Sequence, residues 1–418
     1  MTAFTTADIL LPKLSSEEMT KWAVVACDQY TSEPQYWEKT ADIVGSAPSA
    51  LRLILPEVYL EAPDAKQRIS EINKTMLDYI SSDIFEEYKS SLILTVRTQA
   101  DGKVRTGLVG AIDLEMYDYT KGSTSQVRAT EATVASRIPP RVEIRRDAAL
   151  ELPHIMILID DIKKTVIEPL EARIDTLKKV YDFELMQGGG HLAGYLIDGD
   201  NAKAVFTALD ALADKDGFNS RYGLSGEEVL LYAMGDGNHS LATAKACYEE
   251  KKSSGSPDAA LARYALAEVV NLHSEALEFE AIHRVIVDVD TNDLMSIMTE
   301  KLGLVKGTDG QSFTVVLGGN EENYTITKES SNLTVGSLQS FLDEYLSKNK
   351  GVIDYIHGDD VVRSLSSNDT TCGILLDAMD KNDLFKVVIL DGALPRKTFS
   401  MGDACDKRFY TEARAIRK

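Results

Sequence analysis

The segment Gly235-Asp236-Gly237-Asn238-His239-Ser240 combines a flexible backbone with side chains that can take part in chemistry. Its two glycines, Gly235 and Gly237, allow a sharp turn and a close approach of the backbone to a ligand. Asp236 could bind Mg²⁺ or orient a hydroxyl, and His239 could donate to a phosphate oxygen or shuttle a proton. The alternative is an ordinary turn in which Asn238 or Ser240 caps a helix and His239 lies on the surface.

The flanking residues indicate where this turn lies in the fold. The apolar run 229–234 predicts a buried strand, and residues 241–252, rich in Ala, Leu and Lys, predict a helix. A turn between a strand and a helix lies at the edge of a sheet, where open α/β proteins bind ligands. Its backbone N–H groups, with those at the start of the helix, would form an anion site. This context favours the functional interpretation of the turn.

A second group of candidate residues lies in the basic stretch 125–146. Arg128, Arg137 and Arg141 could hold a phosphate or a carboxylate through paired N–H donors. Glu131, which lies among these arginines, could serve as a base or a metal ligand. The alternative is a solvated patch with ordinary ion pairs, although the grouping of arginines in an acidic protein favours a function.

Asp28 is a further candidate for catalysis because it follows a short apolar run, 22–27, that predicts a strand. His154 and His283 could also reach a site. Each lies beside apolar residues, however, and a histidine in that setting usually has a structural role. We therefore rank Asp28 above both histidines.

The composition of the chain limits the classes of function. Its formal charge of −21 repels nucleic acid and anionic membranes, so neither is an expected partner, while a small anion can still bind at a cluster of arginines. The four cysteines form no C-x-x-C pair, which predicts reduced thiols. The N-terminus resembles no signal peptide, and we expect a cytoplasmic protein.

The order of elements predicts the fold class. Residues 91–98 and 106–114 predict a hairpin through an Asp-Gly turn, and residues 258–271 predict a helix. Strands that alternate with helices indicate an α/β protein, and the hairpins make its sheet mixed, with α+β character. The length of 418 residues suggests two or three units, and we expect a catalytic region at 1–285 and a smaller α/β unit at 286–418.

The chain resembles a bacterial and archaeal family of unknown function, the one numbered one thousand and fifteen, which is related to the ParB and sulfiredoxin fold. The motif that carries the resemblance is Gly235-Asp236-Gly237-Asn238-His239-Ser240-Leu241-Ala242-Thr243-Ala244. Further parts of the resemblance are the segments 24–30 and 128–133 and the pair His283-Arg284.

The resemblance implies a ParB/sulfiredoxin-like catalytic core in which this turn binds nucleotide phosphates. Some relatives phosphorylate free serine with a nucleotide. By resemblance, Gly237, Asn238, His239 and Ser240 would hold the phosphates, while Asp236 or Glu131 would bind a metal or abstract a proton. Ser240 stands where the commoner pattern has an arginine, so the cation on the phosphates would come from Arg128 or Arg141.

These observations lead to one main hypothesis and two alternatives. The main one is a kinase that uses ATP, or another nucleotide, and Mg²⁺ to phosphorylate a small amino or hydroxy acid, above all free L-serine to O-phosphoserine. Asp236, His239, Glu131 and Asp28 are its candidate catalytic residues, with Asp236 as the metal ligand. The alternatives are a nucleotide-binding regulatory module without acceptor chemistry and a phosphohydrolase. A homodimer is a further expectation.

Overall fold

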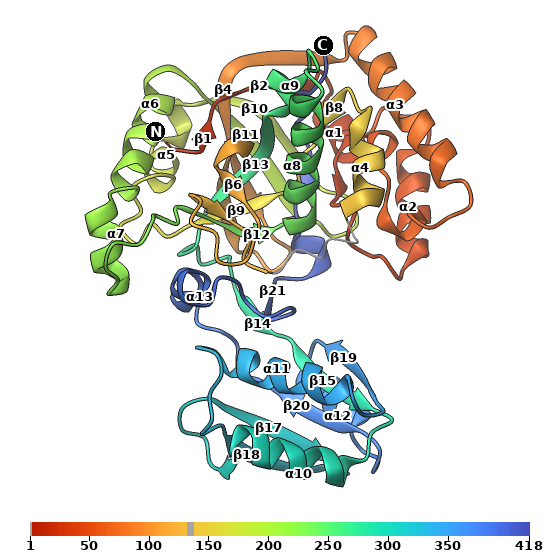
Figure 1. The fold of residues 1–418 in the computed structure, drawn as a ribbon. Helices are drawn as coiled ribbons and strands as arrows, with labels where there is room; N and C mark the ends of the chain where they lie inside the picture. The colour runs from red at the N-terminus through yellow and green to blue at the C-terminus, as the bar shows by residue number, and fades with distance from the viewer. Residues whose placement is uncertain (1, 132–137) are drawn as a thin grey trace. The chain divides into compact units, whose positions relative to one another are not determined.

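The computed structural model describes residues 2–131 and 138–418 and separates the chain into two compact units. Unit 1 comprises Met1–Leu277 and Asp403–Lys418, and unit 2 comprises Glu278–Gly402. Unit 2 is therefore an insertion near the end of the chain of unit 1 (Figure 1). The predicted division at 285 and 286 assigned the last segment to the wrong unit, because the strands that return it to unit 1 are only two residues long.

Unit 1 is built on a large sheet. Its strands are β1 (Phe4–Thr5), β2 (Ala7–Pro12), β4 (Phe85–Thr98), β5 (Val104–Asp113), β6 (Tyr117–Asp118), β7 (Val127–Arg128), β9 (Met156–Ile159), β10 (Lys178–Glu184), β11 (His191–Ile197), β12 (Tyr232–Asp236) and β13 (Tyr264–Asn271). The main path runs β10-β11-β4-β5-β13-β9-β12-β7-β6, with β1 against β5 and β2 against β4. The pairs β13–β9, β12–β7 and β6–β7 are parallel and the other pairs on the path are antiparallel, which confirms the predicted mixed α/β class.

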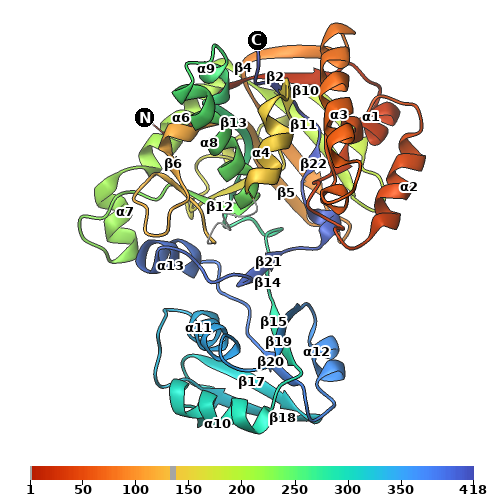
Figure 2. The same cartoon turned by 45° about the vertical axis from the view of Figure 1, so that its right-hand side comes forward.

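Helices cover both faces of this sheet. They are α1 (Ser16–Trp22), α2 (Pro34–Val44), α3 (Ala65–Ser81), α4 (Ile138–Arg146), α5 (Glu168–Glu171), α6 (Gly199–Leu212), α7 (Lys215–Tyr222), α8 (Asn238–Ser253) and α9 (Ala259–Ala262). Figures 1 and 2 show α1, α2 and α3 on one side of the sheet and α5 and α6 on the other. Among the described residues, no helix combines the length and the apolar character that crossing a bilayer requires.

The sheet separates two apolar cores because neighbouring residues of a strand point to opposite faces. In β4, Ile93 packs with the core that contains α1, α2 and α3, while Leu92 and Leu94 pack with the core that contains α5, α6 and α8. In β13, Leu266 joins the first core and Ala267 the second. The positions of the helices are thus set by the alternation of apolar residues along the central strands.

The local predictions had mixed outcomes. The hairpin is confirmed, since Thr98 pairs with Val104 and Ile93 with Val109. The helix expected at 258–271 is wrong beyond Ala262, because Tyr264–Asn271 forms the central strand β13. This strand is buried on both faces, between β5 and β9, and therefore lacks the polar alternation that identifies a strand in a sequence.

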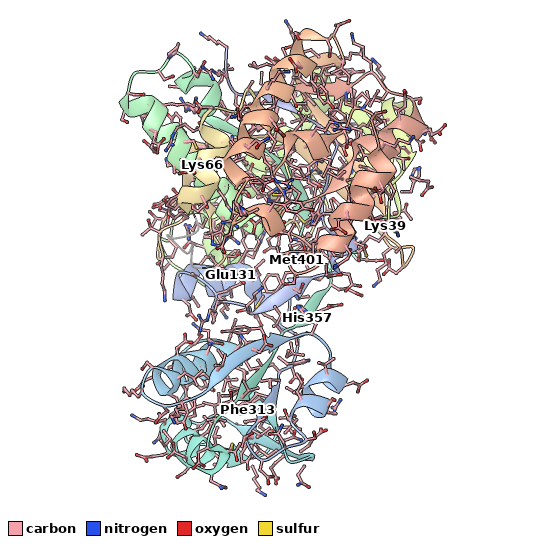
Figure 3. The ribbon with its side chains drawn as sticks, turned by 90° about the vertical axis from the view of Figure 1, so that its right-hand side faces the viewer. Lys39, Lys66, Glu131, Phe313, His357 and Met401 are labelled. Atoms are coloured by element: carbon pink, nitrogen blue, oxygen red, sulfur yellow. The ribbon has the colours of Figure 1, made fainter. Side chains whose placement is uncertain are left out.

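Unit 2 has its own sheet and core. Its strands are β14 (Phe279–Ala281), β15 (His283–Val287), β16 (Val305–Lys306), β17 (Ser312–Leu317), β18 (Asn320–Thr325), β19 (Val352–Ile356), β20 (Cys372–Leu375) and β21 (Phe399–Met401), and its helices are α10 (Thr291–Leu302), α11 (Thr334–Leu346), α12 (Asp359–Leu365) and α13 (Asp383–Asp391). Six strands form an antiparallel sheet in the order β16-β18-β17-β20-β15-β19. Phe313, labelled in Figure 3, is buried in the core between this sheet and α10 and α11.

Candidate functional site

The predicted turn joins β12 to α8 at the edge of the main sheet. Gly237 precedes the helix with φ of +81°, a left-handed conformation that glycine adopts without strain. A Cβ at this position would lie 3.1 Å from the Cα of Ile155, a tight approach that also favours glycine here. Gly237 offers no side chain to cap the helix, and the alternative in which Asn238 or Ser240 serves as the N-cap is wrong. The N-terminus of α8 is thus without a side-chain cap, as in a site that receives an anion.

Ser240, in the first turn of α8, contacts a histidine from a distant segment. Its Oγ lies 2.9 Å from Nε2 of His154, which is buried just before β9. The same Nε2 lies 3.8 Å from Oδ2 of Asp28. A hydroxyl, an imidazole and a carboxylate therefore meet at the start of α8, and the prediction that His154 is only structural overlooked this contact.

Tyr410, from the C-terminal segment, fixes the other side of this imidazole. Its hydroxyl lies 2.7 Å from Nδ1 of His154 and accepts a hydrogen bond from the backbone N–H of Cys27 at 3.2 Å. Burial raises the pKa of Tyr410 well above its ordinary value, so the phenol is neutral. Burial also raises the pKa of the Cys27 thiol, to about 12. His154 thus lies between the hydroxyl groups of Ser240 and Tyr410. Neither Tyr410 nor Cys27 ionises near neutral pH.

Asp28 is the anionic member of the group. Burial raises the pKa of Asp28, but the charge of His154, a hydrogen bond from Gln29 and the charge of Lys407 together lower it below its ordinary value. The Gln29 side chain donates to Oδ1 of Asp28 at 3.0 Å. Asp28 is therefore ionised at neutral pH and can accept a hydrogen bond from a hydroxyl group.

Asp236 ends β12, and its carboxylate contacts Gly237 and Lys407. Gly237 N–H donates to Oδ1 at 2.8 Å, and Nζ of Lys407 lies 3.6 Å from Oδ2. Lys407 also acts on the charge of Asp28. Lys407 comes from the C-terminal segment, which the sequence analysis assigned to the other unit. It places a positive charge beside Asp236, where we expected Arg128 or Arg141 to provide one.

Glu131 follows β7, the strand that runs parallel to β12. The register pairs Tyr232 with Val127 and Ala233 with Arg128, where β7 ends. The hydroxyl of Thr130 donates to the carbonyl of Met234 at 2.8 Å, which ties the two segments together beyond the strands. This hydrogen bond keeps the segment that contains Glu131 beside the end of β12.

The three arginines have different positions. Arg128 is buried and donates to the carbonyls of Ser125, at 2.7 Å, and Glu228, at 2.8 Å, so it stabilises the loop before β12 and is not gathered with the turn. Burial lowers the pKa of Arg128. Arg141 forms an ion pair with Glu57. Arg137 lies outside the described residues.

Asn238 and His239 occupy the first turn of α8. Oδ1 of Asn238 is buried and has no hydrogen-bond partner among the described residues. The carbonyl of His239 accepts a hydrogen bond from the hydroxyl of Thr243 at 2.7 Å, as an ordinary helical residue does.

The C-terminal segment reaches the site because buried charges hold it in unit 1. Arg408 donates to Glu268 on β13 and to Glu412, and its Nε donates to the carbonyl of Pro153 at 2.9 Å. Nearby, β22 (Phe409–Tyr410) pairs with β3 (Val24–Val25). These contacts begin at the residue after Lys407 and include Tyr410 itself, and they hold this part of the segment in unit 1.

His283 and Arg284 belong to β15 of unit 2. Nε2 of His283 lies 2.8 Å from Oδ1 of Asp359, and its Nδ1 accepts from the N–H of Leu376 at 3.2 Å. Arg284 is fully buried and donates to the carbonyl of Lys397 at 2.9 Å. Both residues stabilise unit 2, as predicted for His283.

Together, the fold and the site define a mixed α/β protein with ionisable side chains gathered at a strand–helix turn. The chain belongs to the family described as "Protein of unknown function (DUF1015)", whose model matches residues 12–345. The match therefore contains Asp28, His154 and the turn, but ends before Lys407 and Tyr410. No curated protein sequence matches the chain.

Several solved structures are similar to this one at a low level. A mutant free serine kinase in complex with ADP is 11% identical, with 76% of this chain and 94% of that chain covered and a TM-score of 0.40. A conserved hypothetical protein from Pyrococcus furiosus is 10% identical, with 74% and 95% covered and a TM-score of 0.36. SbnI with a C-terminal truncation, from Staphylococcus aureus, is 10% identical, with 70% and 82% covered and a TM-score of 0.37. Similarity at this level carries no argument about function.

Proposed function

We propose that this chain is a nucleotide-dependent phosphotransferase that acts on a small hydroxyl-bearing metabolite, the class that includes free L-serine. The observation that carries the proposal is the meeting of Asp28 and His154 at the uncapped N-terminus of α8. Phosphoryl transfer depends mainly on positioning and on neutralising charge, and these groups offer both.

The residues have complementary roles in this reaction. The N–H groups at the start of α8 and the ammonium of Lys407 bind the phosphates of the nucleotide. Asp28 accepts a hydrogen bond from the acceptor hydroxyl. The acceptor oxygen then forms a bond to the transferred phosphorus, the bond from this phosphorus to the nucleotide oxygen breaks, and the acceptor proton passes to Asp28. His154, 3.8 Å from Asp28, orients this carboxylate.

Asp236 and Glu131 are the residues that would hold Mg²⁺. Asp236 ends β12, and Glu131 follows β7, the strand that runs parallel to β12. Mg²⁺ binds proteins through one or two carboxylates and completes its shell with water and substrate phosphates. When bound, Mg²⁺ neutralises phosphate charge. Nζ of Lys407 lies 3.6 Å from Oδ2 of Asp236, so the protein adds its own positive charge to that of Mg²⁺.

The test is incubation of the protein with Mg-ATP and a pool of amino and hydroxy acids, followed by mass spectrometry of the pool. We expect one compound to gain a phosphate, and the Asp28→Asn variant to lower this rate by about 10²- to 10⁴-fold. Asp42→Asn, at an exposed position on α2, is the matched control. Nucleotide loss without an organic phosphate would favour a phosphohydrolase, and nucleotide binding without loss would favour a regulatory module.

A further inference from the structure

A cavity of about 140 Å³ in unit 1 lies next to the candidate active site. His154, Ser240 and Tyr410 contribute to its wall, so the cavity is lined by the same imidazole and hydroxyl groups that meet at the start of α8. A molecule in the cavity can therefore place a hydroxyl beside these groups. None of the preceding roles accounts for this space.

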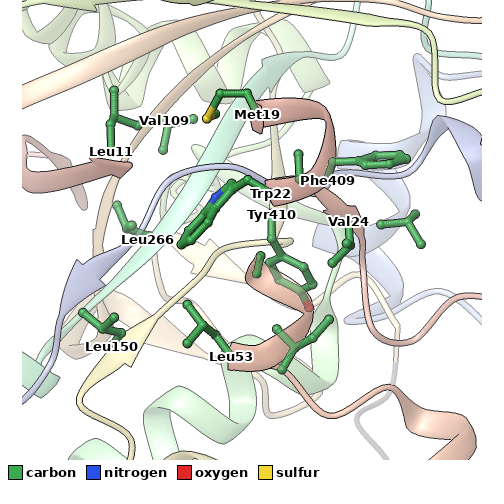
Figure 4. Packing of buried hydrophobic residues seen from close by; sticks show 14 of the residues in the cluster. Leu11, Met19, Trp22, Val24, Leu53, Val109, Leu150, Leu266, Phe409 and Tyr410 are labelled. Atoms are coloured by element: carbon green, nitrogen blue, oxygen red, sulfur yellow. The ribbon is translucent and has the colours of Figure 1, made fainter. Parts of the chain in front are cut away.

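Most of the wall is apolar. Leu53, Leu150 and Leu266 come from three separate parts of the chain, and each is at most 2% exposed. Figure 4 shows these leucines around Tyr410, whose hydroxyl marks the polar end. Such a wall favours a hydrocarbon group over water or a hydrophilic side chain.

The charged side chains in the wall are already paired. Arg141 forms an ion pair with Glu57, and Arg145 forms one with Glu151. Glu151 is buried and also accepts from Nε of Arg414 at 2.7 Å. Binding a second carboxylate or ammonium here would compete with these pairs, so the cavity fits a neutral group.

The size of the cavity limits that group. An apolar protein cavity of about 150 Å³ stays dry and holds one benzene molecule. We propose that this cavity binds the acceptor of the transfer reaction, and that the acceptor is a hydroxyl compound with a neutral apolar group no larger than a benzene ring, in place of free serine. The inference rests on the proposed function for the role of the bound molecule.

The test measures binding in the full-length protein without nucleotide, by saturation-transfer NMR, with benzyl alcohol and L-serine as probes. We expect benzyl alcohol to bind at least about tenfold more tightly than L-serine, because only its ring buries apolar surface. Ala148 lines the cavity, and Ala148→Leu should weaken benzyl alcohol binding about tenfold by filling the space. ATP affinity, measured by calorimetry, should not change.

Two further variants make the result decisive. Ala204→Leu, at an exposed position on α6, is the matched control and should leave benzyl alcohol binding unchanged. Leu152→Phe, at a partly buried position of the wall, replaces Ala148→Leu if that variant does not fold. L-serine binding as tightly as benzyl alcohol, or unchanged benzyl alcohol binding in a folded variant, would overturn the inference.

Measuring phosphate transfer alongside benzyl alcohol binding distinguishes a failure of this inference from a failure of the proposed function. Transfer to L-serine in a protein that does not bind benzyl alcohol would overturn the cavity inference and leave the proposed function standing. Selective binding of benzyl alcohol in a protein that transfers phosphate to no acceptor would support the apolar pocket and overturn the proposed function.

Discussion

Oγ of Ser240 lies 2.9 Å from Nε2 of His154, although 86 residues separate them in the chain. The contact joins the first turn of α8 to the segment before β9. It brings an imidazole to a helix terminus that no side chain caps, and Asp28 lies 3.8 Å from the same nitrogen. In our account this arrangement orients the acceptor hydroxyl and the carboxylate that receives its proton.

Replacing His154 therefore tests its positioning role. His154→Gln should lower kcat about a hundredfold and change KM for ATP little, because the loss acts on proton transfer and not on phosphate binding. His191→Gln, which removes a histidine paired with Asp182 at 2.7 Å on the surface, is the control. Equal effects of the two variants would show that His154 has no special role.

Tyr410 holds Nδ1 of this imidazole, so removal of its hydroxyl should act through His154. Tyr410→Phe leaves the N–H of Cys27 and Nδ1 of His154 without this partner, and we expect a loss of about 1–3 kcal/mol in the free energy of unfolding. We also expect a roughly tenfold lower kcat. Tyr117→Phe is the matched control, because its buried hydroxyl has no hydrogen-bond partner among the described residues. A stable Tyr410→Phe variant with full activity would contradict the account.

Arg408 holds the C-terminal segment in unit 1. Arg408→Met would leave Glu268 and Glu412 buried without their cation, and breaking such a pair costs about 3–5 kcal/mol. Urea denaturation should show this decrease in the free energy of unfolding. Arg417→Met, at a half-exposed side chain near Asp258, should cost less than about 1 kcal/mol. A small effect at Arg408 would mean that other contacts hold the segment.

The same buried carboxylates predict how stability depends on pH. Burial raises the pKa of Glu268 and of Glu151, but Arg408 acting on the first and Arg414 on the second lower each below the ordinary value of 4.5. The unfolded chain therefore binds these protons at a higher pH than the native protein does. Their stabilising contribution is complete above the unfolded pKa and is lost as the pH falls through the lower native pKa.

Urea denaturation between pH 7 and pH 3 measures this dependence. Each of the two groups should contribute a slope of up to about 1.4 kcal/mol per pH unit below the unfolded pKa. Replacing Glu268 by Gln should remove its part of the slope. A free energy of unfolding that is constant or rises as the pH falls would contradict the assignment.

The turn, its flanking strand and helix, and the hairpin could be predicted from the sequence, because local spacing and turn residues determine them. Asp28 was singled out as a candidate in the same way. The contacts of His154 could not be predicted, since its partners Ser240 and Tyr410 are distant in the chain. The position of Lys407 could not be predicted from the sequence, because β22 is too short to recognise and its partner strand β3 is near the N-terminus.

Arg128 shows the opposite case, in which a suggestive residue type has an ordinary role. Arginines near a candidate phosphate site favour an anion-binding interpretation, but the donors of Arg128 are directed at the backbone carbonyls of Ser125 and Glu228. The sequence does not reveal which acceptors lie within reach of a long side chain. The position of such a residue depends on the tertiary fold.

The central claim is tested most directly by following the terminal phosphate of ATP, labelled with ³²P, in the presence and absence of acceptors. The account predicts that the label appears in an organic phosphate only when an acceptor is present, and that Asp28→Asn slows the formation of this product by about 10²- to 10⁴-fold without weakening ATP binding. Label found only as inorganic phosphate, or ATP that binds and is never consumed, would contradict it.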